Sequence, residues 1–187
     1  MLPIFGHFQF LVGQVEDFAD RIAQVASSDG FKKGDTIALV MGNRPEYLGV
    51  RVGLAQLGVI TALVNINLRD RALEHTIEIV SSKAVIVEGE FTEAIHEIRS
   101  AGRLPGVVKV YQFEGELLPG SDDLRARMAA APPGRPEVRD PPHFHDTAMY
   151  VYSSGTTGLP KACILPHSKT IIGPVVFKIL MDVTHRG

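Results

Sequence analysis

Residues 152–161 read Tyr-Ser-Ser-Gly-Thr-Thr-Gly-Leu-Pro-Lys, a polar run with two glycines set between two apolar runs, 148–152 and 162–165. This pattern predicts a strand, a polar loop and a second strand. Glycines let the backbone approach an anion closely, successive backbone N–H groups form a concavity for it, and hydroxyls and a lysine add donors and charge. The run therefore suits the binding of phosphate.

The spacing of this run separates it from two better-known phosphate loops. A Walker A loop has four residues between its first glycine and a Gly-Lys pair, whereas here two residues separate Gly155 from Gly158, and Pro160 precedes Lys161. The run is not the G-x-G-x-x-G dinucleotide fingerprint either. On composition alone, a hairpin turn with a solvated lysine is the alternative, because short glycine-rich matches often arise by chance.

The ten-residue run resembles the phosphate-binding signature of the AMP-forming adenylating enzymes, which include acyl-CoA synthetases, luciferases and peptide-synthetase adenylation domains. Its one departure is Ser153, where the family usually has Thr, so the hydroxyl is kept. Four earlier segments follow the family's N-terminal region in order: 34–39, 43–47, 53–58 and 65–69. The last of them, with 150–152 and 167–168, most resembles the branch of fatty-acid transport proteins and very-long-chain acyl-CoA synthetases. The likeness runs from about residue 15 to about residue 177.

The resemblance implies a reaction and its participants. A fatty-acid carboxylate attacks the α-phosphorus of ATP and releases pyrophosphate, and CoA then displaces AMP from the acyl-adenylate. Lys161 and Thr156 are the expected catalytic residues, because negative charge develops on the leaving pyrophosphate. The expected nucleotide-binding residues are Tyr152, Ser153, Ser154, Gly155, Thr156, Thr157, Gly158 and Lys161. ATP/AMP, Mg²⁺ and CoA are the expected cofactors and co-substrate, with no Mg²⁺ ligand assigned.

The signature is present without the family's later motifs for adenine, ribose and the C-terminal lid. We therefore expect residues 1–187 to be the N-terminal part of an AMP-binding (adenylation) domain, without the lid domain and inactive alone. The alternative is a non-catalytic short isoform or remnant that binds nucleotide or a protein partner, and an unrelated nucleotide-binding module ranks third. For the complete protein the branch implies fatty-acid uptake and membrane association, at the cytosolic face of the endoplasmic reticulum or plasma membrane, through segments outside this chain. A homo-oligomer is left open.

The composition is that of a soluble globular protein. Of the 187 residues, 21% are charged and 45% hydrophobic, and the formal net charge of −2 gives no electrostatic case for nucleic acid. The single cysteine, Cys163, excludes an internal disulfide, fits a reducing, cytoplasmic setting, and is expected to be buried in its apolar strand. No run reaches the ~20 apolar residues of a membrane span, and residues 1–13 are expected to form an edge strand or a truncated end.

Strand and helix patterns alternate along the chain. Continuous apolar runs predict buried strands, and apolar residues at a 3.6-residue period predict helices. The predicted strands are 36–41, 59–64, 84–87, 107–111, 148–152 and 162–165, and the predicted helices are 15–26, 45–57, 70–80, 91–101 and 122–131. The alternation indicates an α/β fold of βαβ units with a mostly parallel sheet flanked by helices. Five prolines make 132–142 a stiff connector within the domain.

Some residues carry local structural expectations. Asn43 is expected to cap the helix that begins at Pro45. Gly49 and Gly53 lower the helix propensity of that segment, and we expect close packing on a sheet to compensate. The acidic stretch 88–97, with Glu88, Glu90, Glu93 and Glu97, is most simply a solvated helix face.

Three further groups of residues are candidate sites. His143, His145 and Asp146 have no further ligand nearby in the sequence, so no metal site is assigned there. His167 begins a short helix in either a functional or a capping role, and both interpretations stay open. The segment 65–69, with Asn65, Asn67 and Arg69, follows a strand, which is where ligands bind in open sheets, but turn formation and helix capping are the simpler interpretation.

Overall fold

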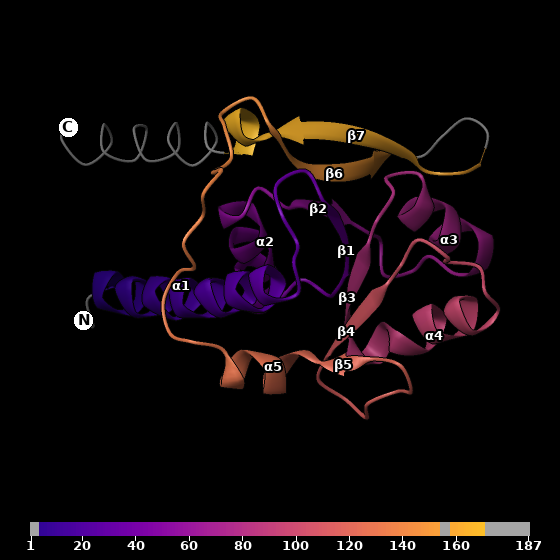
Figure 1. The fold of residues 1–187 in the computed structure, drawn as a ribbon, viewed down its shortest axis with the longest axis horizontal. Coiled ribbons are helices and arrows are strands. Elements are labelled where there is room, and N and C mark those ends of the chain that lie inside the picture. Colours follow the sequence, from indigo (N-terminus) through magenta and orange to yellow (C-terminus); the bar gives the residue numbers. More distant parts are fainter. Residues whose placement is uncertain (1–3, 154–157, 171–187) are drawn as a thin grey trace.

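A seven-stranded sheet forms the centre of the molecule (Figure 1). The computed structural model describes residues 4–153 and 158–170, with side chains described from residue 13 onward. The strand order is β5-β4-β3-β1-β2-β6-β7. The strands are β1 Thr36–Val40, β2 Ile60–Leu63, β3 Ala84–Glu88, β4 Lys109–Phe113, β5 Asp122–Asp123, β6 Thr147–Ser153 and β7 Lys161–Pro166. Every neighbouring pair is parallel except β6 and β7, which confirms the predicted mostly parallel sheet.

Helices cover both faces of this sheet. They are α1 Ile4–Ser28, α2 Pro45–Gln56, α3 Asp70–Glu78, α4 Thr92–Ser100 and α5 Leu124–Ala130, with a 3-10 turn, η1, at Gly89–Phe91. In Figure 1, α1 and α2 lie on one side of the central strands and α3 and α4 on the other. The predicted flanking layers of an α/β fold are thus present.

The alternation of side chains along β1 explains the two layers. Ile37 and Leu39 pack in the cluster that contains α1 and α2. Ala38 and Val40 pack in the opposite cluster, with α3 and α4. Because successive side chains of a strand point to opposite faces, a strand buried on both faces must be apolar throughout. This is the continuous apolar run seen in the sequence.

The two glycines of α2 pack against α1 rather than against the sheet, so the expected partner was wrong. A β-carbon at position 49 would overlap the ring of Phe18, and one at position 53 would overlap the Ala19 carbonyl oxygen and lie 2.8 Å from the Ile22 Cβ. Close approach of two helices offsets the low helix propensity of glycine. The physical reason foreseen was correct, but the neighbouring element was not.

Three element boundaries differ from expectation. Residues 4–13 belong to the long helix α1, where an edge strand or a truncated end was expected. Arg44, with extended backbone, occupies the N-cap of α2 in place of Asn43, and no side chain caps that helix; Pro45 pre-sets the helical φ. The segment 122–131 begins as the short strand β5, and Asp123 then caps α5 by accepting a hydrogen bond from the Ala126 amide at 3.0 Å.

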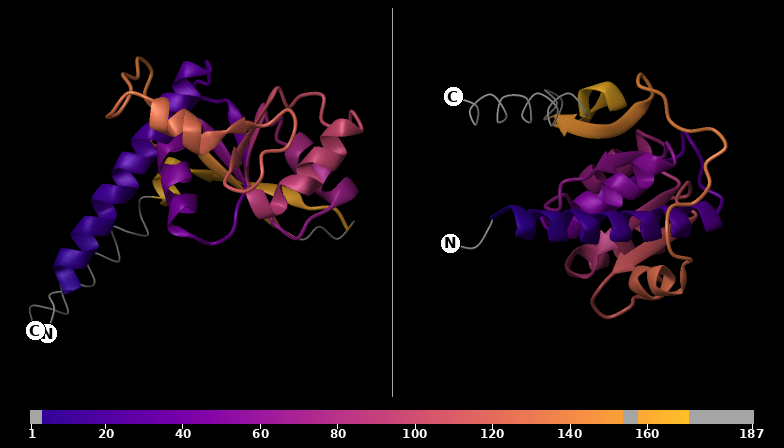
Figure 2. Two further views of the ribbon diagram at one scale, coloured as in Figure 1. Left: turned by 90° about the horizontal axis from the view of Figure 1, so that it is seen from below. Right: turned by 90° about the vertical axis from the view of Figure 1, so that its left-hand side faces the viewer.

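The proline-rich connector 132–142 has no helix or strand, as predicted. Figure 1 and the side views of Figure 2 show it running past α1 from α5 to the β6–β7 hairpin. The Gln24 side chain donates to the Gly134 carbonyl at 2.9 Å, and the Lys33 ammonium pairs with Asp140 at 3.3 Å and with Asp146 at 2.9 Å. These bonds fix the connector to α1 and to the turn after it, and so fix the start of β6.

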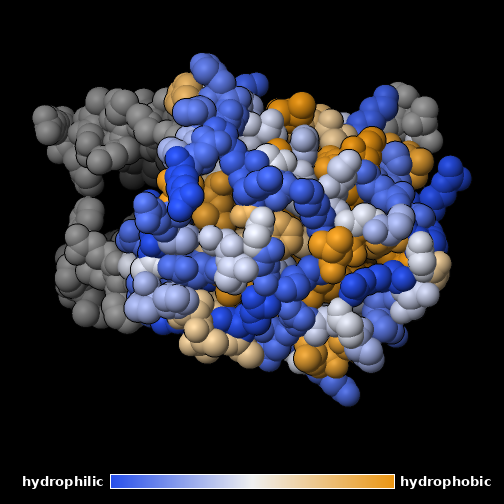
Figure 3. Space-filling view, viewed as in Figure 1, coloured by the Kyte–Doolittle hydropathy of each residue, from blue (hydrophilic) through white to orange (hydrophobic). Residues whose placement is uncertain are grey.

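The surface mixes polar and apolar side chains. On the face shown in Figure 3, hydrophobic residues gather mainly on the side occupied by α3, α4 and the neighbouring strands. Large hydrophobic side chains that are exposed include Ile79, Val108 and Ile164. None of the described helices combines the length and the apolar character needed to cross a bilayer.

Candidate functional site

The signature run begins at the end of β6 and reaches the start of β7, and these two strands form an antiparallel hairpin. Tyr152 pairs with Ala162, and Ser153 pairs with Lys161, so the two strands meet directly at the loop. Because β6 is parallel to β2, its carboxyl end lies at the same edge of the sheet as the carboxyl ends of β1, β2, β3 and β4. Ligands of open α/β sheets bind at this edge. The fold thus places the run where a ligand would be expected.

The described residues of the run are open to solvent at the points where phosphate could approach. Ser153, Gly158 and Lys161 are exposed. Gly158 has a φ of +84°, a left-handed conformation that favours glycine. Ser154, Gly155, Thr156 and Thr157, which include the expected catalytic threonine, lie outside the described residues.

Helix α3 supports both ends of this loop, which the sequence did not foretell. The Tyr152 hydroxyl donates to the Thr76 carbonyl oxygen at 2.7 Å. The His75 Nε2 lies 3.1 Å from the Pro160 carbonyl oxygen, a hydrogen bond in which the ring donates when Nε2 carries the proton. Burial raises the pKa of Tyr152 well above its ordinary value, so the phenol stays protonated as a donor.

Strand β7 and the helical turn after it hold two other predicted residues, Cys163 and His167. Cys163 is exposed, so the expectation of a buried thiol was wrong; β7 is a sheet edge, and the face carrying Cys163 is open. Its Sγ lies 3.8 Å from the Ser153 Oγ. His167 begins a helical turn as predicted, and its amide donates to the Asp146 carbonyl at 3.0 Å, while burial lowers the pKa of its imidazole.

The His143–Asp146 segment forms a turn. The Asp146 carboxylate accepts a hydrogen bond from the His143 amide at 2.7 Å and pairs with Lys33. Among the described residues, no three His, Cys, Asp or Glu side chains are grouped to hold a metal ion. The Asp146 carboxylate is thus occupied in holding the chain that leads into β6.

The remaining candidates are structural in these surroundings. The Asn65 side chain accepts a hydrogen bond from the Asn67 amide at 2.9 Å, which is the turn that the sequence suggested. Glu90, Glu93 and Glu97 are exposed as predicted. Glu88 differs, because it accepts from the Gly42 amide at 2.8 Å and from Arg44 at 2.8 Å, and so ties the ends of β1 and β3 together.

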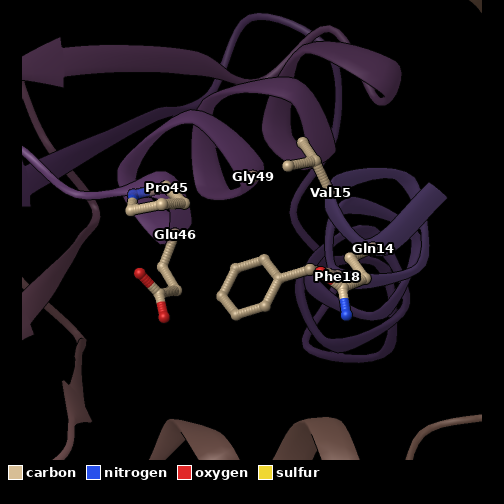
Figure 4. A pocket seen from close by; sticks show the side chains of 6 residues that line it. All are labelled: Gln14, Val15, Phe18, Pro45, Glu46 and Gly49. Atoms are coloured by element: carbon tan, nitrogen blue, oxygen red, sulfur yellow. The ribbon is translucent and has the colours of Figure 1, made fainter. Parts of the chain in front are cut away.

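A small hollow lies between α1 and α2, away from the hairpin. Figure 4 shows the Phe18 ring extending from α1 toward α2, with the Glu46 carboxylate beyond it. The hollow is completed by Gln14, Val15, Pro45 and Gly49. Glu46 pairs with Arg44 at 2.9 Å. A carboxylate and an aromatic ring do not attract phosphate, so we assign this hollow to helix packing.

Curated proteins similar to this chain include fatty acid transport proteins and a fatty-acid–CoA ligase. The chain is 34% identical over 164 residues to long-chain fatty acid transport protein 6 of Mus musculus, covering 86% of this chain and 26% of the relative. It is 27% identical over 174 residues to the medium/long-chain-fatty-acid–CoA ligase FadD6 of Mycobacterium tuberculosis, covering 92% of this chain and 28% of the relative. The chain therefore spans about a quarter of the length of these relatives.

Solved structures similar to this chain include CoA ligases. The anthranilate CoA ligase AuaEII, in complex with anthranoyl-AMP, matches with a TM-score of 0.75 and 25% identity, over 82% of this chain and 29% of that chain. The N-terminal domain of FACL13 from Mycobacterium tuberculosis matches with a TM-score of 0.72 and 29% identity, over 83% of this chain and 37% of that chain. The fold described above is thus that of the N-terminal domains of acyl-CoA ligases.

The family described as AMP-binding enzyme matches residues 5–184, nearly the whole chain. This match includes the hairpin and its signature run. It agrees with the resemblance first suggested by residues 152–161 and with the relatives found on the sequence and structural sides. This chain belongs to the AMP-binding enzyme family, among the fatty acyl-CoA synthetases and related adenylating enzymes.

Proposed function

We propose that this chain supplies the phosphate-binding part of an ATP-dependent, AMP-forming synthetase that converts a fatty acid and CoA to acyl-CoA through an acyl-adenylate. The observation that carries the proposal is the placement of the family's signature run on a hairpin at the carboxyl edge of a parallel sheet. Residues 1–187 are then the N-terminal part of the adenylation domain, and the lid domain and the adenine and ribose sites lie elsewhere in the complete protein.

The role of the loop is electrostatic. As the fatty-acid carboxylate attacks the α-phosphorus of ATP, negative charge moves onto the departing pyrophosphate, and donors placed around it lower the barrier. Ser153 and Lys161 pair where the loop leaves the two strands, a position that we call the loop neck. Exposed Lys161 supplies a positive charge at one side of the loop neck, and exposed Ser153 supplies a hydroxyl at the other. The residues Ser154, Gly155, Thr156, Thr157 and Gly158 complete the proposed nucleotide site, with Thr156 as the second catalytic residue, and Tyr152 borders this site with its hydroxyl bound to the Thr76 carbonyl oxygen.

The proposed acid is a long-chain or very-long-chain fatty acid. The long-chain assignment follows the relatives, a long-chain fatty acid transport protein and a medium/long-chain-fatty-acid–CoA ligase, and the very-long-chain assignment follows the sequence resemblance. A contribution to fatty-acid uptake and attachment to the cytosolic face of a cellular membrane, through segments outside this chain, belong to the same proposal. CoA is the co-substrate of the second step.

Mg²⁺ is expected to accompany ATP. It prefers oxygen ligands and usually binds through one or two carboxylates together with substrate phosphates. The described residues offer no group of three or more His, Cys, Asp or Glu side chains suited to it. We therefore assign it no ligand among the described residues.

The test is ATP–pyrophosphate exchange dependent on a long-chain fatty acid, measured on the complete protein. Lys161→Ala should lower the exchange rate by about 100-fold, the effect of removing one donor from such a site. The KM for ATP should change less, because the lysine acts mainly on charge that develops in the transition state. Lys169→Ala removes another exposed lysine, in the turn after β7, and should leave the rate unchanged.

Equal rates for the wild type and Lys161→Ala would remove the catalytic role of that lysine. Nucleotide binding without any exchange, in the complete protein, would favour the alternative of a non-catalytic form. The isolated chain is expected to bind nucleotide weakly and not to catalyse the exchange.

A further inference from the structure

Two hydrogen bonds join the last turn of α3 to the two ends of the signature loop. Tyr152, immediately before Ser153, donates to the Thr76 carbonyl at 2.7 Å. Pro160, immediately before Lys161, accepts from His75 at 3.1 Å. Ser153 and Lys161 face each other across the loop neck. Adjacent residues of one helix thus hold both strands at the point where the loop begins and ends.

The bond to Thr76 satisfies a carbonyl that the helix itself leaves available. The last four carbonyls of a helix lack intrahelical partners. In α3, the carbonyls of His75, Ile77 and Glu78 accept from the amides of Ile79, Ser82 and Ser81, at 2.9, 3.2 and 2.8 Å. The Thr76 carbonyl accepts from the Tyr152 hydroxyl instead. This bond therefore fixes β6 to the helix as well as completing the helix end.

The bond from His75 to Pro160 restrains the backbone at the other end of the loop. Proline has no N–H, so it forms no amide hydrogen bond of its own, and its fixed φ already limits the chain just before β7. The His75 ring is half-buried and reaches the carbonyl of that residue. Rotation of the chain about Pro160 would break this bond, so the direction in which Lys161 leaves the loop is set by α3.

We propose that His75 and Tyr152 are positioning residues for the phosphate loop, acting through Pro160 and Ser153 rather than by touching the nucleotide. The inference rests on the proposed function. Donors aimed at a leaving group accelerate a reaction only when they are held in place beforehand, and a shift of about 1 Å can cost about 100-fold in rate. The two hydrogen bonds fix the backbone on both sides of the loop, which is the support that such donors require.

Four variants test this role in the complete protein. Tyr152→Phe keeps the ring, which packs against the α3–α4 cluster, and removes only the hydroxyl. Tyr150→Phe makes the same change on the same face of β6 and is the matched control. His75→Ala removes the second bond, and His75→Gln supplies an amide donor in its place.

The kinetic prediction separates positioning from general destabilisation. Tyr152→Phe and His75→Ala should each lower kcat/KM for ATP in pyrophosphate exchange by about tenfold, while KM for the fatty acid stays within about twofold. His75→Gln should recover most of the loss, and Tyr150→Phe should match the wild type. A comparable rise in the KM for the fatty acid, an unchanged kcat/KM for ATP, or no recovery in His75→Gln would overturn the proposal.

A second measurement does not depend on activity. Amide hydrogen exchange of residues 153–161 should be faster in Tyr152→Phe and His75→Ala than in the wild type, while exchange in β1 is unchanged. If the wild-type protein shows no pyrophosphate exchange, the proposed function fails, yet this measurement still decides whether α3 holds the loop. Unchanged amide exchange around the loop in both variants would overturn the positioning role whatever the activity.

Discussion

Gly53 in α2 lies so close to Ala19 in α1 that a β-carbon at position 53 would overlap the Ala19 carbonyl oxygen. The obstacle is backbone, which cannot move aside like the end of a flexible side chain. The α1–α2 contact therefore depends on glycine at this position. The same contact keeps α1 against the sheet face that carries Ile37 and Leu39.

Gly53→Ala should lower the free energy of unfolding by about 2 kcal/mol, because overpacking of this kind costs about 1–3 kcal/mol and outweighs the gain of about 1 kcal/mol in helix propensity. Equilibrium urea unfolding of the purified chain measures the change. Gly13→Ala is the control, since no atom lies within 4 Å of a β-carbon at position 13 and the variant should be slightly more stable. Equal effects of the two substitutions would contradict the packing argument.

Glu88→Ala should destabilise the carboxyl edge of the sheet. The carboxylate accepts from the Gly42 amide and from Arg44, both at 2.8 Å, and its loss leaves these partly buried donors without this partner. We expect about 2 kcal/mol of lost stability by the same unfolding assay. Glu90→Ala, at an exposed position two residues away, should change stability by less than about 0.5 kcal/mol.

The Asp29 carboxylate should make the stability depend on pH in acid. Burial opposes its ionised form, but hydrogen bonds from Arg127, Tyr111 and Lys109 prevail, so its pKa lies below the ordinary value of 3.8. A lowered pKa stabilises the folded chain at pH values above 3.8, and this contribution is lost as the pH falls through the folded-state value.

Asp29→Asn should therefore be less stable than the wild type at pH 7 and should lose less stability between about pH 4 and pH 2. Urea unfolding at a series of pH values gives both quantities. Asp17→Asn, at an exposed position in α1, serves as the control for removal of one carboxylate. If the free energy of unfolding of Asp29→Asn depends on pH as steeply as that of the wild type, other groups are responsible for the loss of stability in acid.

Cys163 offers a chemical probe of the proposed nucleotide site. Its thiol is exposed and lies 3.8 Å from the Ser153 hydroxyl at the loop neck. Alkylation with a bulky maleimide should abolish pyrophosphate exchange, and ATP should slow the labelling, with peptide mass mapping used to follow Cys163 alone. Cys163→Ser should remove the inhibition and keep the activity. Labelling of Cys163 at the same rate with and without ATP would place the nucleotide away from this neck.

Sequence patterns predicted the layers of this fold because its strands are buried on both faces. A strand such as β1, which is apolar at every position from Ile37 to Val40, is readily predicted as a buried strand. The errors fell where tertiary contacts decide the outcome. The Gly49–Gly53 spacing is compatible with packing on a helix or on a sheet, and Cys163 is apolar enough for a core strand yet lies on a sheet edge.

In the candidate site, the sequence likewise predicted the local residues but not their tertiary contacts. The loop residues are contiguous, so a local motif suffices to find them. Their support from α3 could not be predicted, because His75 and Pro160 are 85 positions apart and Thr76 contributes only a backbone carbonyl. Every residue type has a backbone carbonyl, so the sequence does not indicate which carbonyl accepts a hydrogen bond from a distant side chain.

The order of the strands also bears on how the chain folds. Helices α2, α3 and α4 connect the strands from β1 to β4 in turn, whereas β6 must return across the molecule to pair with β2, with Thr61 opposite Met149. Forming that pair closes a long segment of chain, which costs entropy and slows the step. The hairpin is therefore expected to dock late, after the earlier units have formed the edge that receives it. A newly made or partly unfolded chain would then present no organised phosphate loop, so the ability to hold nucleotide would report completion of the fold.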